Sequence, residues 1–118
     1  MSGVAYLIAI KFKSVFGIEA LAYLAGVDKT KVSEWLELRL GSKGFTNEVV
    51  RRMLLALEIV DGFSRRNVSE PVARAWFEAS RPELDDLSPL QFLKERPFEE
   101  AEVVLWNLTK AGIDYEKI

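Results

Sequence analysis

Apolar residues recur along most of this chain at the three- and four-residue spacing of an α-helix. The longest run lies between Thr46 and about Arg66, and its apolar positions are Val49, Val50, Met53, Leu54, Leu57, Val60 and Phe63. An apolar face of this width is typical of a helix that packs against a core. The pattern predicts one long helix over 46–66, with Thr46 as its cap.

Two shorter helices are predicted ahead of the long one. The segment 4–15 is rich in apolar residues and ends before Gly17, while 18–25 has apolar residues at helical spacing. Within the first segment Tyr6, Ile8, Ile10 and Phe12 also alternate with other residues, which suits a β-strand. The pattern therefore leaves open whether residues 4–16 form a helix or a strand.

The stretch GVDKTKVSEWLE that follows predicts a turn and a further helix. Gly26 suits the positive φ of a helix end, and Asp28 can cap a helix over 29–40. In the preceding helix Ala22 is small enough for the two helices to approach closely. We expect Val32 and Trp35 to face back toward that preceding helix. This spacing predicts helix-turn-helix geometry. Two packed helices with no role in DNA binding are the alternative.

Serine and proline mark the starts of the helices in the C-terminal half. Ser69-Glu70-Pro71 opens a predicted helix to about Ser80, Ser88-Pro89 opens another to about Glu95, and Pro97 opens the last, which we expect to end at Gly112. The remaining tail is 113–118. The chain thus predicts an all-α fold of about seven helices.

The segment 41–44, Gly-Ser-Lys-Gly, is the best candidate boundary between two lobes. It predicts a helix-turn-helix domain over 1–45, joined by the long helix to a small helical domain within 46–118. A chain of 118 residues can form one domain or two such lobes.

The composition argues against catalysis. The chain contains no histidine and no cysteine, so the usual general base, the strongest nucleophile and the usual zinc ligands are missing. No phosphate-binding glycine loop or nucleophile elbow is present. We therefore expect a binding protein, not an enzyme, with no metal and no cofactor.

The apolar run 4–10 is too short to span a membrane, and Lys11 and Lys13 follow it, whereas a signal peptide carries its charges ahead of such a run. We expect a cytoplasmic protein without membrane attachment. The run is also more apolar than one buried helix face requires, which predicts a homodimer.

Charge is distributed unevenly along the chain. Residues 1–45 hold six Lys and Arg against four acidic residues, although the whole chain has a net charge of −2. The mildly basic first third favours weak promoter DNA binding by the predicted helix-turn-helix, as a dimer or larger complex. The candidate DNA-contacting residues are Lys29, Thr30, Lys31, Ser33, Glu34, Arg39 and Lys43.

The C-terminal block ARAWFEASRPELDDLSPLQFLKER is rich in apolar and aromatic residues. We expect Trp76, Leu87, Leu90 and Leu93 to lie in the core. Some of Phe77, Phe92, Phe98 and Trp106 should face outward, and clustered exposed aromatics mark a protein-binding patch.

This block resembles the Xre/MbcA/ParS family of antitoxins, whose toxin partners have a RES domain. The family joins an Xre-like helix-turn-helix to a small toxin-binding domain. Its hallmarks are a Trp near a helix end, a loop similar to P-N-x-x-L-x-G, and then x-P-x-x-L. Here they correspond to Trp76, the segment 81–87 and the segment 88–93. The family's loop glycine is Asp86 in this chain, and a glycine that often closes its recognition helix is Leu38.

The resemblance implies a type II antitoxin that covers the active site of an NAD-degrading RES toxin and often represses its own promoter. The residues that would then contact the toxin are Phe77, Phe92, Phe98, Trp106, Lys110, Ile113, Asp114, Tyr115, Lys117 and Ile118. For the tail 113–118 a frayed terminus is the alternative. For the whole chain the alternative is a stand-alone helical DNA-binding regulator or adaptor without a toxin.

Overall fold

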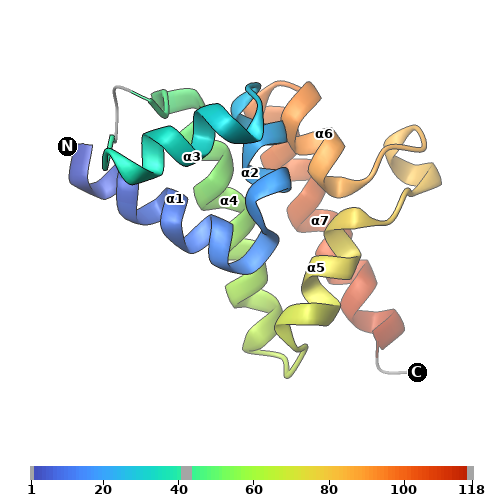
Figure 1. Cartoon of the computed structure of the whole chain (residues 1–118). Coiled ribbons are helices and arrows are strands. Elements are labelled where there is room, and N and C mark those ends of the chain that lie inside the picture. The colour runs from blue at the N-terminus through green and yellow to red at the C-terminus, as the bar shows by residue number, and fades with distance from the viewer. Residues whose placement is uncertain (1, 41–43, 117–118) are drawn as a thin grey trace. The chain divides into compact units, whose positions relative to one another are not determined.

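The computed structural model describes the backbone of residues 2–40 and 44–116 and the side chains of residues 3–40 and 44–110. Over the described backbone the chain has seven α-helices, one short 3-10 helix and no strand (Figure 1). The predicted all-α fold is confirmed. The elements are α1 (Ser2–Phe16), α2 (Ile18–Ala25), α3 (Lys29–Glu37), α4 (Asn47–Ser64), α5 (Glu70–Glu78), the 3-10 helix Pro82–Leu84, α6 (Pro89–Glu95) and α7 (Phe98–Glu116).

The chain divides into two compact units, Met1–Leu54 and Leu55–Ile118. We call them unit 1 and unit 2. The division falls within α4 and not in the glycine-rich segment 41–44, so the first turns of α4 belong to unit 1 and the rest to unit 2. Domains with separate functions over 1–45 and 46–118 remain a prediction.

The segment for which helix and strand were both open is helix α1. Its buried residues are Ala5, Ala9, Phe12, Val15 and Phe16, which follow helical spacing. Two neighbouring residues of the alternating series differ: Ile10 is exposed, whereas Phe12 is fully buried. Phe12 stacks on Phe16 with ring centroids 4.6 Å apart. The segment therefore forms a helix that buries one face, although its sequence also shows the alternation of a strand.

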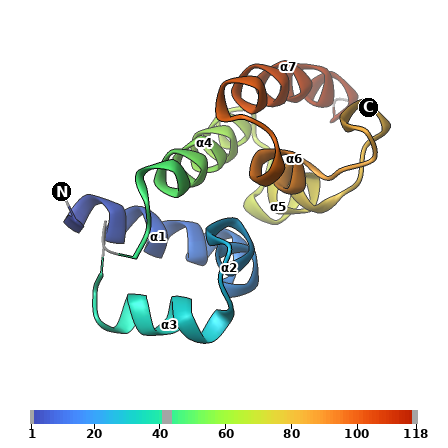
Figure 2. The ribbon, with the colours of Figure 1, turned by 90° about the horizontal axis from the view of Figure 1, so that it is seen from above.

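The turn from α2 into α3 has the predicted local geometry. Gly26 takes the left-handed conformation, with φ 78°, and its N–H donates to the carbonyl oxygen of Ala22. The Asp28 carboxylate then accepts from the Lys31 N–H at 2.8 Å, which caps α3. In Figure 2, α2 joins the end of α1 to the start of α3 at one end of unit 1.

Helix α3 differs from the prediction at its end and on its buried face. It stops at Glu37 instead of Leu40, because Arg39 takes the left-handed conformation (φ 55°) and the Leu40 N–H bonds back to the carbonyl of Trp35. Val32 is buried as expected, but Leu36 is the second buried residue. Trp35 is half-buried and packs edge-on against Phe45, with ring centroids 5.2 Å apart. The aromatic partner of Trp35 is thus Phe45, beyond the end of α3, whereas the sequence predicted that Trp35 packs toward α2.

In unit 2 the caps predicted from sequence form as expected. Ser69 accepts from the Val72 N–H at the start of α5. Ser88 and Gln91 form a reciprocal capping box at the start of α6, with bonds of 2.8 and 3.1 Å. Helix α6 packs against both α5 and α7 (Figure 2).

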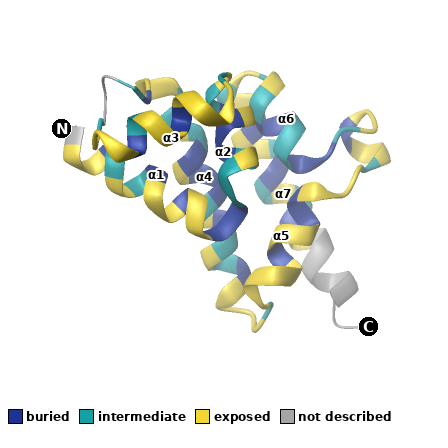
Figure 3. Cartoon of the chain, in the orientation of Figure 1, coloured by how far each residue is buried: buried dark blue, intermediate teal, exposed yellow. Residues whose placement is uncertain are grey.

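Aromatic rings lie between α4 and α5 in the interior of unit 2. Trp76 packs edge-on against both Phe63 and Phe77, with centroids 5.2 and 5.0 Å apart. Leu93 is also buried, as predicted, whereas Leu87 and Leu90 are half-buried. Figure 3 shows how the buried residues follow one side of each helix.

The last helix is longer than the sequence predicted. Helix α7 continues to Glu116 and does not end at Gly112, so the expected free tail from 113 onward is wrong over 113–116. A glycine inside a helix costs only about 1 kcal/mol relative to alanine, and no proline follows to stop the helix. The side chains of Ile113, Asp114 and Tyr115, and all of Lys117 and Ile118, lie outside the described part of the chain.

None of the helices, over the residues described, combines the length and the apolar character needed to cross a bilayer.

Candidate functional site

The exposed face of α3 carries most of the residues predicted to contact DNA. Thr30 and Ser33 are exposed near its start. Lys29 forms an ion pair with Glu19 at 3.1 Å, and Lys31 lies 3.9 Å from Glu34. Both lysines are thus partly neutralised by carboxylates of the same unit. Arg39 is exposed beyond the end of α3, and Lys43 lies outside the described residues.

These ion pairs do not prevent the lysines from meeting phosphate. The side chains of Lys29 and Lys31 are 58% and 53% exposed, and ion pairs at such positions contribute only about 0–1 kcal/mol. A phosphate oxygen can therefore replace the carboxylate as partner of either lysine. The face is nevertheless only weakly attractive to DNA, because Asp28, Glu34 and Glu37 are exposed on the same helix or at its cap.

A tight loop joins α5 to α6 and is organised around the backbone of Arg81. Its N–H donates to the carbonyl of Leu87, and its carbonyl accepts from the N–H groups of both Leu84 and Asp86. Asp85 and Asp86 both take the left-handed conformation, with φ of 58° and 66°. Leu84 is buried, so its side chain anchors the loop in the core.

Arginine side chains cover the two ends of this loop. The Arg81 guanidinium lies over the Trp76 ring, 5.1 Å from its centroid. Arg96, at the end of α6, donates to the Asp85 carboxylate at 2.9 Å and lies 5.1 Å above the Phe92 ring. The loop is therefore tied to the end of α5 and to the end of α6.

The four aromatics of which some were predicted to face outward separate into two pairs. Phe77 is fully buried and Phe92 is 3% exposed, so both belong to the core, and their prediction as toxin contacts is wrong. Phe77 shares the inner face of α5 with Ala73 and Trp76, and Phe92 lies beneath Arg96. Phe98 and Trp106 are half-buried and remain candidates.

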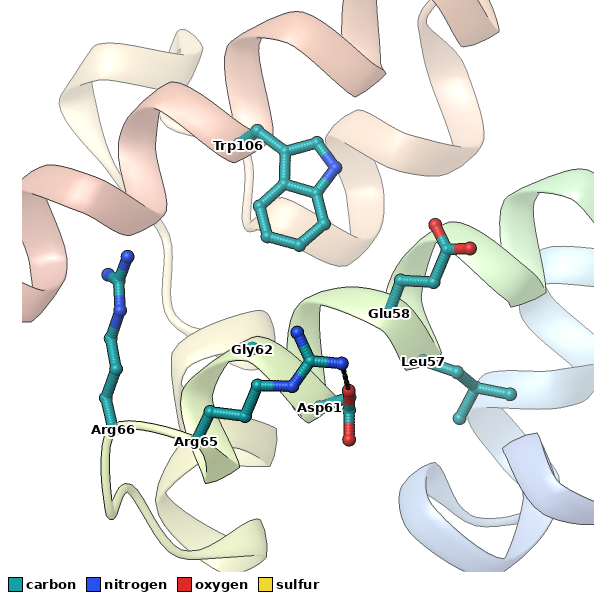
Figure 4. Close-up of a pocket in the computed structure, with 7 residues that line it drawn as sticks. All are labelled: Leu57, Glu58, Asp61, Gly62, Arg65, Arg66 and Trp106. Atoms are coloured by element: carbon teal, nitrogen blue, oxygen red, sulfur yellow. Dashed lines mark ion pairs between the residues drawn. The ribbon is translucent and has the colours of Figure 1, made fainter.

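Trp106 lines an open hollow on unit 2, with a volume of about 610 Å³. Figure 4 shows its indole leaning from α7 toward Gly62 of α4. A Cβ added to Gly62 would lie 3.4 Å from Cζ3 of the indole, an ordinary van der Waals contact, so the ring lies over this part of α4. The residues that line the hollow are Leu57, Glu58, Asp61, Gly62, Arg65, Arg66 and Trp106.

Charges of both signs surround the indole. Arg65 and Asp61 form an ion pair at 2.7 Å (Figure 4). Glu58 and Arg66 are exposed and have no ion pair among the described side chains. A smaller recess of about 60 Å³ adjoins the hollow, and Arg66, Trp106, Thr109 and Lys110 line it. Lys110 is exposed there.

Sequence reasoning found Trp106 and Lys110 but missed the α4 side of the hollow. The signal was present in the spacing of Glu58 and Gly62 on α4 and of Arg65 and Arg66 just beyond its end, since these residues recur every three or four positions. The described residues contain no group of three or more acidic side chains that could hold a metal ion.

Comparison with known proteins finds no relative of this chain: no family model, no curated protein sequence and no solved structure matches it.

Proposed function

We propose that this protein is a type II antitoxin whose unit 2 binds and neutralises a RES-type, NAD-degrading toxin. The observation that carries the proposal is the half-exposed Trp106 in an open hollow, with Arg66 and Lys110 beside it. Tryptophan and arginine are the residues most enriched at the energetic centres of protein interfaces. A partner protein that covers the indole would remove its remaining apolar surface from water.

The loop between α5 and α6 supports the antitoxin assignment. In the family that the sequence resembles, a glycine is common at the position of Asp86. Asp86 takes the left-handed conformation that glycine favours, with φ 66°. The substitution therefore retains a backbone conformation suited to the family's loop, and Ser88 begins the next helix with a full capping box.

We further propose that unit 1 binds promoter DNA weakly through α3. The left-handed Gly26, the Asp28 cap and the exposed Thr30 and Ser33 support it. The phosphate contacts would come from Lys29 and Lys31 after they exchange their carboxylate partners. Binding by two copies at two half-sites would then raise the affinity of a weak single contact.

The test is co-expression of the chain with the reading frame beside it in its genome, followed by affinity purification and growth assay. We expect the neighbouring product alone to arrest growth and deplete NAD, and this chain to restore growth and to co-purify with it. A neighbouring product that is harmless or does not bind would contradict the antitoxin proposal.

A stand-alone regulator is the second candidate, and the surface of α1 favours it. Val4, Leu7 and Ile10 are exposed at three-residue spacing, which suits a regulator that dimerises through α1. A chain that binds promoter DNA but no neighbouring protein would support this candidate.

A further inference from the structure

We infer that the hollow of unit 2 receives a short segment of the partner protein that carries an apolar side chain between two opposite charges. In this arrangement an apolar side chain covers Trp106, an acidic side chain faces Arg66 and Lys110, and a basic side chain faces Glu58. The inference deepens the proposed function and rests on it, because the partner is the neutralised toxin.

Opposite charges flank the indole from two neighbouring elements. Glu58 lies on α4, and Arg66 lies in the turn that follows the end of α4 at Ser64. Figure 4 shows these two side chains on opposite sides of the indole. A partner segment with one charge on each side of an apolar side chain can therefore meet both ends of the hollow at once.

The two ends of the hollow differ in sign. Arg65 and Asp61 neutralise each other in the middle, which leaves Glu58 on α4 at one end and Arg66, in the turn after α4, at the other. Neither of these two has an ion pair among the described side chains, and Lys110 adds a positive charge in the recess that Arg66 also lines. A segment with the opposite order of charges is attracted in one direction and repelled in the reverse direction.

A protein segment fits this site better than a small anion does. A lone phosphate or carboxylate would meet Glu58 and Asp61 across the same hollow as Arg66. The hollow is also open, so a small ligand would stay largely in water and gain little from Trp106. A side chain held by a partner protein covers the indole while the rest of that protein excludes water from the rim.

The experiment measures binding of the purified neighbouring toxin to four variants of the full chain: Arg66→Glu with Lys110→Glu, Glu58→Lys, Trp106→Ala, and Arg74→Glu as control. Arg74 lies on α5 of the same unit, outside the hollow, in an exposed ion pair with Glu78. Its reversal changes the charge by the same amount and sign as each of the two reversals in the double variant, without touching the site. The exposed charge reversals leave the core intact, and a thermal melt of each variant verifies folding.

We expect the double reversal to weaken binding by about tenfold or more, and Trp106→Ala by roughly thirtyfold, the size of a hot-spot residue. Glu58→Lys should weaken binding by about threefold, and Arg74→Glu should stay within about twofold, as for a charge outside the contact. The association rate of the wild-type chain should fall with added salt, and the double reversal should flatten that dependence.

Three outcomes would overturn the inference. If the toxin binds the charge-reversed chains as tightly as the wild type, the hollow is not the contact, while the antitoxin proposal stands. If the double reversal separates a dimer of this chain and leaves toxin binding intact, the occupant is a second copy. If the wild-type chain binds no neighbouring product, both the inference and the proposed function fail.

Discussion

At the scale of single residues, backbone conformation is the most informative feature of unit 2. Asp85 and Asp86 lie next to each other in the left-handed region, with φ of 58° and 66°. Aspartate tolerates this region better than most residues, yet the conformation still strains any side chain with a Cβ. Of the two, Asp85 alone has an ion pair among the described side chains, to Arg96. The two aspartates therefore differ in what their side chains contribute.

Asp86→Gly should stabilise the protein by about 0.5–1 kcal/mol, because relief of left-handed strain exceeds the extra entropy of an unfolded glycine. The midpoint of urea unfolding should rise. Asp85→Gly is the matched control: it relieves the same strain but loses the ion pair to Arg96, so its gain should be smaller. A lower midpoint for Asp86→Gly would show that its side chain stabilises the loop.

Replacement by alanine should change the stability of the protein in opposite directions at the two glycines that lie beside tryptophans. At Gly44 a Cβ would lie 2.8 Å from Cδ2 of Trp35, so Gly44→Ala should destabilise the protein by about 1–3 kcal/mol through overpacking. At Gly62 the nearest indole atom would be 3.4 Å away, an ordinary contact. Gly62→Ala should stabilise α4 by about 0.5–1 kcal/mol. Urea unfolding measures both, and equal effects of the same sign would refute the distinction.

At the scale of elements, the balance of charge on α3 decides how the proposed DNA contact behaves. Each lysine at its start has a carboxylate neighbour: Glu19 for Lys29 and Glu34 for Lys31. Glu34 belongs to α3 itself and is exposed. It both competes for Lys31 and repels phosphate, so α3 carries attraction and repulsion on one face.

Reversal of Lys29 and Lys31 to glutamate should abolish promoter binding and leave toxin inhibition unchanged. Glu34→Gln should act in the opposite direction and raise the affinity by roughly threefold at low salt, because one repulsive charge is removed. A gel-shift series at several salt concentrations, with the promoter fragment, measures both. If the wild-type protein, alone and with toxin, shifts no fragment at low salt, the DNA-binding proposal is wrong.

At the scale of the whole molecule, the surface of α1 bears on assembly. Val4 and Leu7 are 54% and 65% exposed, and Ile10 is exposed at the next step of the same stripe. The inner face of the helix already buries Ala5, Ala9, Phe12, Val15 and Phe16. The outer stripe is therefore apolar surface beyond what the fold of unit 1 uses, and a second copy of the chain is the proposed partner.

Leu7→Lys should shift the protein from dimer to monomer, because it places a charge in the middle of the apolar stripe. Light scattering at high micromolar concentration should show the change in mass. Ser80→Lys adds the same charge at an exposed polar position off α1, in unit 2, and should leave the dimer intact. A wild-type protein that is monomeric under these conditions would count against the prediction.

Much of the fold could be predicted from the sequence because its signals are local. Gly26, Asp28, Ser69 and Ser88 set helix ends through φ angles and cap hydrogen bonds within a few residues. Periodicity placed α2 at its observed bounds and α4 within two residues. These features depend on the chemistry of one short segment, so no knowledge of the rest of the chain was needed.

The tertiary structure alone decided which helix faces are buried against other helices. Sequence could not tell that Phe77 and Phe92 are buried while Trp106 is half-exposed, because all three are aromatics on amphipathic helices. Nor could it place Glu58 of α4 and Arg66 of the following turn around the indole of a residue forty positions away or more. That arrangement follows from the packing of the Trp106 side chain of α7 over Gly62 of α4. The candidate site thus depends on how the helices pack together, whereas the helices themselves could be predicted from the local sequence.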